Sequence, residues 1–355
     1  MLLDILDTYV LKAIVEEVVP ETSFFRDRYF LTGADDVFAE DKVLVEYRKA
    51  DLRMAAFVAP RAGDIPVDRR GYEIHEFAPP NIAPSRLLTV DELKKRGFGE
   101  RLIAGTTQAE RAARIVLQDV TDLDRRIKRR EEWMCAQTMI TNGCEMQEYI
   151  DAETTGELLR VQFYDGTSDH EHTISIPWNA PTGDFFGDVE AMCWLLSRRG
   201  LTAADLIVGS QVAGAITDIQ KVRDLLDNRN MSYGSIAPRV ENYAGIAVIG
   251  ILNFNGFQLN IINVLHSYVD EAGIARPFFP ATSAMVTAPG CGRLMYGSVT
   301  QIDFGNTIHT THTGARIPKL SVDQEKDTRK LRIAARPLAA PNHYCPYIYA
   351  ANVVA

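Results

Sequence analysis

The sequence predicts an α+β fold in which one long helix joins two regions rich in strands. Three patterns lead to this prediction. Residues 107–141 have helical periodicity, residues 42–81 read as extended chain, and residues 184–266 alternate between helix and strand patterns. Strand-like segments then return, so the chain leaves one sheet region, builds a second and comes back to the first.

In residues 107–141, apolar side chains recur every three or four positions, which places them on one narrow helix face with a gap around Arg130. Thr107 and Glu110 form a capping-box pattern at the start, and Asn142 and Gly143 tolerate left-handed dihedral angles at the end. At about 1.5 Å per residue the helix would be roughly 50 Å long. The charged residues are assigned to its other faces: Arg111, Arg114, Asp119, Asp122, Asp124, Arg125, Arg126, Lys128, Arg129, Arg130, Glu131 and Glu132. The pattern fits a helix across a sheet, an ordinary surface helix or a coiled-coil arm.

The chain before this helix reads as a helix at 4–18, then an aromatic-rich arm at 22–38, and then an extended ribbon. The arm is expected to dock on its own subunit or on a neighbour. Strand patterns at 42–48, 53–58 and 72–77 surround a turn cluster at 60–66. Because an isolated two-stranded ribbon is marginal in water, the ribbon should lie on another surface. The alternative is an edge hairpin packed on its own domain.

After the long helix, the patterns predict the following elements. Strands are expected at 145–151, 158–164 and 172–176, and a loop and domain boundary at 178–183. A helix at 184–198, a strand at 205–208 and a helix at 211–227 capped by Ser210 follow. Strands 243–253 and 257–266 meet across Asn255-Gly256, a favoured hairpin turn. The last strands are expected at 283–288, 293–302, 330–335 and 344–354, with a polar loop at 305–327.

Composition places the chain among ordinary soluble globular proteins. It has 355 residues, of which 46% are apolar and 24% charged. The formal charge of −9 argues against a protein whose main task is to grip phosphates. Five scattered cysteines without a Cys-x-x-Cys pair favour free thiols in a reducing cytoplasm. We expect no secretion signal and no membrane span.

The search for catalytic motifs predicts no enzyme, no metal and no cofactor. The sequence has no phosphate-binding loop with Gly-Lys-Ser/Thr, no Gly-x-Ser-x-Gly elbow and no His-Glu-x-x-His helix. His170 and His172 would share one strand face and could chelate a divalent ion, but their polar surroundings favour a hairpin tip. His309 and His312 form a second weak pair without a nearby acidic or cysteine ligand.

Several more specific stretches follow one another along nearly the whole chain. They begin with Lys-Val-Leu-Val-Glu at 42–46, Met-Ala-Ala-Phe-Val-Ala-Pro at 54–60 and Glu-Phe-Ala-Pro-Pro at 76–80. Arg125-Arg126 and Glu131-Glu132 follow inside the helix, then Asp-Leu-Ile-Val at 205–208, Lys-Val-Arg-Asp-Leu-Leu at 221–226, and Ala-Met-Val at 284–286 before Tyr296-Gly297. In this order the stretches resemble the tailed-bacteriophage major capsid proteins, and the lambda-type major capsid protein E family in particular.

This resemblance implies the tailed-phage major capsid protein fold. Its parts would be an N-terminal arm at 1–41, an E-loop at 42–90, the spine helix and first part of the P-domain sheet at 91–182, an α/β A-domain at 183–290, and the return strands of the P-domain at 291–355. The chain would be a structural subunit of an icosahedral phage or prophage shell, built from hexamers and pentamers around double-stranded DNA. It would reside in the virion, and in the host cytoplasm during assembly.

The implied partners are further copies of the chain, with scaffold, portal and decoration proteins as possible additions, weak non-specific contact with packaged DNA, and no membrane. The hypothesis for the interface is that charged and apolar ribbon residues meet a neighbour's helix, where arginines face Asp119, Asp122 and Asp124 along one surface. These interface residues are Arg48, Asp51, Arg53, Met54, Phe57, Arg61, Asp64, Arg69, Arg70, Arg125, Arg126, Arg129 and Arg130. Two alternatives stay open, a non-viral nanocompartment shell of the same fold and a metal-dependent enzyme.

Overall fold

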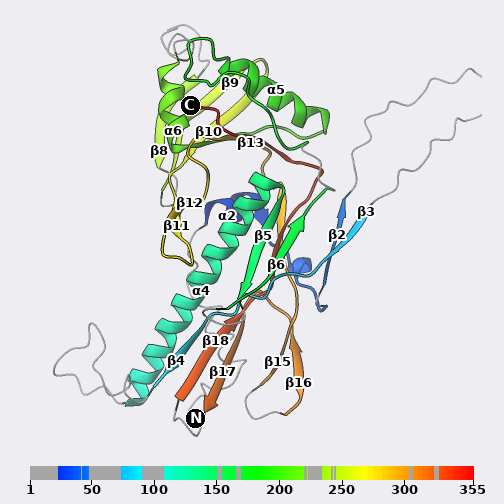
Figure 1. Ribbon diagram of the computed structural model, residues 1–355, viewed down its shortest axis with the longest axis vertical. Coiled ribbons are helices and arrows are strands. Elements are labelled where there is room, and N and C mark those ends of the chain that lie inside the picture. Colours follow the sequence, from blue (N-terminus) through cyan, green and yellow to red (C-terminus); the bar gives the residue numbers. More distant parts are fainter. Residues whose placement is uncertain are drawn as a thin grey trace, which may run out of the picture.

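The computed structural model shows an elongated subunit in which a long helix, α4, runs between an α/β unit and a set of smaller sheets (Figure 1). It describes residues 23–40, 42–47, 73–89, 108–149, 154–164, 169–219, 222, 234–240, 243, 245–303, 307–323 and 328–355. The predicted helix at 4–18, the predicted strand at 53–58 and the Thr107 cap lie outside these residues.

Helix α4 spans Gln108–Thr141, which confirms the predicted long helix. It ends where predicted because Asn142 adopts a left-handed conformation, with φ of 55°. The next residue must be glycine, since a Cβ on Gly143 would lie 2.4 Å from the carbonyl oxygen of Val161. The chain then turns back along the helix as strand β5 (Gly143–Tyr149), paired antiparallel with β6 (Thr155–Gln162).

The α/β unit is a six-stranded sheet in the order β20-β13-β7-β10-β9-β8, and it carries helices α5 and α6. Its hairpin turn has positive φ at Asn255 and Gly256, as predicted. Helix α6 ends at Asp218 instead of 227, because Ile219 is extended, and Gly209 rather than Ser210 occupies the cap position. The elements are α5 (Phe185–Arg198), α6 (Ser210–Asp218), β7 (Asp205–Gly209), β8 (Gly234–Val240), β9 (Ile246–Phe254), β10 (Phe257–Val264), β13 (Ala284–Thr287) and β20 (Tyr347–Ala350).

Smaller sheets surround α4, and they bring together segments far apart in the sequence. The sheets β1-β14-β19 and β17-β18-β4 have three strands each, and the sheets β2-β3, β11-β12 and β15-β16 have two strands each. Their bounds, with those of the short helices, are α2 (Phe24–Tyr29), β1 (Phe30–Leu31), η1 (Ala34–Asp36), β2 (Val43–Tyr47), β3 (Glu73–Phe77), β4 (Ser85–Leu88), β11 (Ser267–Val269), β12 (Ala275–Pro277), β14 (Gly292–Tyr296), β15 (Val299–Ile302), β16 (His309–His312), β17 (Ile317–Asp323), β18 (Thr328–Ala334) and β19 (Pro337–Pro341).

Two predictions about the strands are wrong. The predicted polar loop at 305–327 contains β16 and β17, whose polar sequences lack a clear apolar alternation. The predicted strand at 172–176 does not form. Only the neighbouring Glu171 makes an isolated bridge to Tyr349 in this region.

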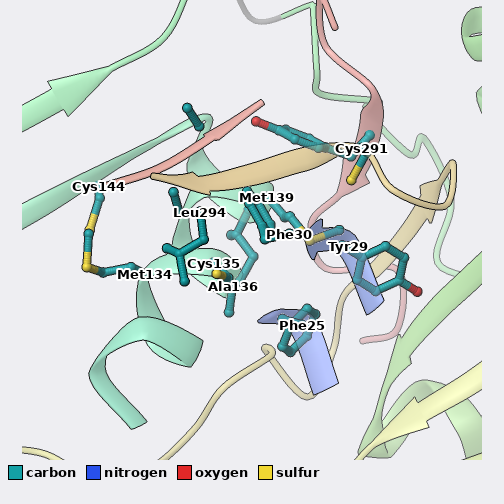
Figure 2. Close-up of a cluster of buried hydrophobic side chains, with 14 of the residues drawn as sticks. Phe25, Tyr29, Phe30, Met134, Cys135, Ala136, Met139, Cys144, Cys291 and Leu294 are labelled. Atoms are coloured by element: carbon teal, nitrogen blue, oxygen red, sulfur yellow. The ribbon is translucent and has the colours of Figure 1, made fainter. Parts of the chain in front are cut away.

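The aromatic arm docks on its own subunit. Phe24, Phe25, Tyr29 and Phe30 are all buried in the core that also takes the C-terminal half of α4. Figure 2 shows Phe25, Tyr29 and Phe30 beside the helix residues Cys135 and Met139. A second core lies inside the α/β unit, and a third lies between α4 and the β17-β18-β4 sheet. Helix α4 is therefore packed along most of its described length.

Candidate functional site: the charged faces of the long helix

Most acidic side chains of α4 point into the protein, which corrects the prediction that its charges lie on solvent-facing surfaces. Glu131 and Glu132 are 0% and 1% exposed. They occupy the gap in the apolar pattern near Arg130, where the helix still packs against the body of the protein. Buried charges are costly unless they are paired, so each must have a partner. The buried charged residues of this helix are Asp119, Asp124, Lys128, Glu131 and Glu132.

Arg316, which immediately precedes β17, neutralises the buried carboxylates of Glu131 and Asp124. Its Nη1 and Nη2 donate to the two carboxylate oxygens of Glu131 at 2.6 and 2.9 Å, and its Nε donates to Asp124 at 2.6 Å. Lys128 contacts the other oxygen of Asp124 at 2.6 Å, and the Tyr296 hydroxyl donates to Glu131 at 3.0 Å. The arrangement is a fork-to-fork arginine–carboxylate pair extended by a second carboxylate.

The pKa values of this cluster follow from burial and pairing. Burial disfavours the charge on Arg316, but the carboxylates of Glu131 and Asp124 outweigh it and raise the Arg316 pKa above its usual range. Burial alone would raise the pKa of Asp124, yet Arg316 and Lys128 hold it below its ordinary value. Both groups are therefore charged at neutral pH.

Glu132 points to a different partner, the start of helix α2. Its two oxygens accept the backbone N–H groups of Phe25 and Arg26 at 2.8 and 2.9 Å. Burial raises the pKa of Glu132 to about 7, although these two hydrogen bonds favour its charged form. Glu132 thus holds the arm through a carboxyl group that titrates near neutral pH.

The same short helix is tied to the α/β unit at its other end. Arg28 donates from Nε and Nη2 to Asp205 at 2.8 and 2.9 Å, and the Tyr29 hydroxyl donates to Asp205 at 2.9 Å. Asn260 of β10 also donates to this carboxylate, at 3.0 Å. Asp205 is fully buried at the start of β7. Helix α2 therefore connects the long helix to the α/β sheet.

The four arginines predicted on α4 are divided between two environments. Arg125, Arg126 and Arg129 are exposed. Arg130 pairs with Glu271 in the turn between β11 and β12, and its guanidinium lies 5.0 Å from the Trp133 ring centroid. The structure thus brings Arg130 into an intrachain contact and leaves the other three at the surface.

The predicted opposition of these arginines to acidic residues on the same surface is wrong for Asp119 and Asp124. Asp119 and Asp124 are buried, because the helix face that carries them packs on the protein body. Asp119 and Asp122 accept from Arg86 of β4, at 2.6 and 3.0 Å. The acidic side chains are thus engaged inside the subunit.

The predicted interface residues of the ribbon cannot be placed. Arg48, Asp51, Arg53, Met54, Phe57, Arg61, Asp64, Arg69 and Arg70 lie outside the described residues. The ribbon's base is described, and it forms the antiparallel pair β2-β3 with an exposed ion pair between Lys42 and Glu76 at 2.9 Å. Phe77 contacts Phe163 edge to face, with ring centroids 5.1 Å apart.

The histidine pairs occupy different environments from those predicted. His170 is 5% exposed and therefore does not sit at a polar hairpin tip. His172 lies 3.5 Å from Asp188, and His312 lies 2.8 Å from Asp303. Among the described residues, no group of three or more His, Cys, Asp or Glu side chains is placed to hold a metal ion. All five cysteines are buried, and none of them forms a disulfide bond.

Sequence reasoning missed Arg316, Arg28 and Asp205. Arg316 stands alone in a polar loop pattern, and nothing local distinguishes it from a surface arginine. One signal was available, because the apolar face of α4 is interrupted at 128–132 by charges while apolar positions continue on both sides. A packed helix with such an interruption needs buried counter-charges from elsewhere.

Comparisons with known proteins agree along nearly the whole chain. The family model described as phage major capsid protein E matches residues 7–347. Among solved structures, the chain is similar to a protein assigned as a prophage capsid protein of Escherichia coli CFT073, with a TM-score of 0.65, 16% identity and coverage of 97% and 98% of the two chains. It is also similar to a phage-related protein from Bordetella bronchiseptica RB50, with a TM-score of 0.50, 10% identity and 97% coverage of each chain. No curated protein matches the sequence.

Proposed function

The chain belongs to the phage major capsid protein E family, and from this premise we propose that its copies assemble into the hexamers and pentamers of a closed icosahedral shell. Membership makes it a structural protein of a phage or prophage capsid. The predicted tailed-phage capsid fold is confirmed as well. We further propose that the chain has no catalytic activity.

The proposal about assembly rests on the base of the ribbon, which is the strand pair β2-β3. Among the described strands, β2 and β3 pair only with each other. A two-stranded sheet is marginal in water, so a ribbon over residues 48–72, as the sequence predicts it, would need another surface. A neighbouring subunit supplies that surface in a shell, through head-to-tail contacts that close when the rotation returns to its start.

Exposed apolar side chains on two hairpins support the same proposal. Ile308, beside the β15-β16 hairpin, is 75% exposed, and Val269 of β11 is 68% exposed. Single exposed apolar residues are normal, but these two are accessible to a second copy. We propose that both become buried on assembly.

The remaining parts of the proposal follow from the family. The chain is divided into an arm at 1–41, an E-loop at 42–90, the spine helix with the first part of the P-domain at 91–182, an A-domain at 183–290, and the return strands of the P-domain at 291–355. The shell encloses double-stranded DNA, which it contacts weakly because the subunit is acidic. Scaffold, portal and decoration proteins join it, and assembly takes place in the host cytoplasm. None of the helices in the described ranges is long and apolar enough to cross a membrane.

Electron microscopy of the purified protein tests this function. Closed shells, or rings of five and six subunits, are the expected result. A monodisperse monomer under every salt and pH condition tried, with any scaffold supplied, would contradict it. Particles produced in the native host should contain a genome, whereas enzyme cargo would identify a nanocompartment instead.

A further inference from the structure

Three arginines of α4 stand out as exposed charged residues of the helix. Arg125, Arg126 and Arg129 are exposed, and we call these three the arginine stripe. The acidic residues of the helix are instead buried or paired with Arg86: Asp119, Asp122, Asp124, Glu131 and Glu132. Among the charged residues of α4 whose side chains are described, these three arginines are exposed, whereas the acidic residues are buried or, as for Asp122, half-buried against Arg86.

The N-terminal arm enters the structure beside this stripe. Glu132, Arg129 and Arg125 are spaced by three and four residues, so they lie on one side of the helix. Glu132 accepts the N–H groups of Phe25 and Arg26, which fixes the start of α2 on that same side. Residues 1–22 are therefore joined to the described chain next to Glu132, which lies within about 10 Å of Arg129 and Arg125 along the helix axis.

Residues 1–22 have the opposite charge. They contain five acidic residues, Asp4, Asp7, Glu16, Glu17 and Glu21, and one basic residue, Lys12. A segment of this length spans up to roughly 70 Å when extended, so it can reach the whole stripe. We propose that residues 1–22 dock on the arginine stripe of their own chain, held by ion pairs with Arg125, Arg126 and Arg129.

Chymotrypsin cleavage at Tyr9 of the full-length, unassembled subunit tests the docking. In the unmodified chain, cleavage should be slow at low salt and faster in about 0.5 M NaCl, because exposed ion pairs are screened. The combined change Arg125→Glu, Arg126→Glu and Arg129→Glu should raise the low-salt rate by about fivefold or more. A control with the same change of charge at other exposed positions, Arg198→Glu, Arg329→Glu and Lys330→Glu, should leave the rate unchanged.

Charge exchange distinguishes docking from general loosening of the subunit. Adding Asp4→Lys, Asp7→Lys, Glu16→Lys and Glu17→Lys to the stripe variant should restore slow cleavage, and all variants should melt at the same temperature. Equal cleavage of stripe and control variants, or no rescue by exchange, would overturn the proposal. Protection that rises with protein concentration would assign the stripe to a neighbour's arm, and would also overturn it.

Discussion

The bidentate pair between Arg316 and Glu131 shows how one residue governs a buried face of the long helix. Replacing Arg316 by Met would leave Asp124 buried with Lys128 alone, and Glu131 buried with only the longer contact to Arg26, at 3.6 Å. We expect the free energy of unfolding to fall by about 3 to 5 kcal/mol, as measured for broken buried pairs. Chemical denaturation of the unassembled subunit measures this.

Two comparisons make the Arg316 prediction specific. Arg329→Met, at an exposed position, should change stability by less than about 0.5 kcal/mol. Adding Glu131→Gln to Arg316→Met should recover part of the loss, because one unpaired buried charge is removed. Additive losses in the double variant would show that the two groups are not coupled.

Glu132 predicts a pH dependence of stability. Its folded pKa of about 7 exceeds the ordinary value of 4.5, so its contribution is full below about pH 4.5 and is lost as pH rises through 7. Relative to Glu132→Gln, the unmodified subunit should lose about 3 kcal/mol of stability between pH 4.5 and 8. Urea denaturation at several pH values measures the difference, and parallel profiles for the two proteins would contradict it.

At the scale of elements, the ribbon should be separable from the subunit's own stability. Deleting residues 61–70, which lie outside the described part, should leave the melting temperature nearly unchanged while closed shells disappear. The reason is that the described contacts of the ribbon with its own subunit lie at its base, where Val43 and Val45 are buried in the core and Phe77 contacts Phe163, and the deletion leaves this base in place. Melting and particle yield are measured together. If the melting temperature and the particle yield both fall sharply, the ribbon belongs to the subunit's core.

Elements with a local cause were predictable from the sequence, and long-range ones were not. The periodicity of α4, the left-handed Asn142 and the Asn255-Gly256 turn depend on neighbouring residues, and the structure confirms them. Strand β16, with the sequence His-Thr-Thr-His, has no apolar alternation and forms by pairing with β15. The early end of α6 likewise has no local stop signal, since its apolar spacing continues past Asp218.

The candidate site was predictable only in part, for the same reason. The exposed arginines 125, 126 and 129 follow from helix position, because they avoid the apolar face. Two of their supposed acidic neighbours, Asp124 and Asp119, are buried, and they pair with Arg316 and Arg86, which are 192 and 33 residues away in the sequence. No pattern within the helix reports which side chain will meet it from another part of the chain.

For the whole molecule, the exposed apolar residues Ile308 and Val269 should contribute to shell assembly and not to the stability of the subunit. Ile308→Ser together with Val269→Ser should lower shell yield sharply, because each buried side chain of this size contributes about 1.5 to 3 kcal/mol per copy. The unassembled subunit should keep its stability within about 0.5 kcal/mol. Sedimentation of assembly reactions measures the yield. Normal yield would remove both hairpins from the proposed contacts.

The pairing of Arg316 with Glu131 also bears on when the subunit can fold as it is made. The two residues are 185 positions apart. At about 5 to 20 residues per second, Glu131 is synthesised roughly 10 to 40 seconds before Arg316. During that interval Glu131 lacks its main counter-charge, so the helix cannot be buried without a large cost. The nascent chain therefore cannot complete its folding until translation is nearly finished, and only full-length subunits present a surface that can join a growing shell.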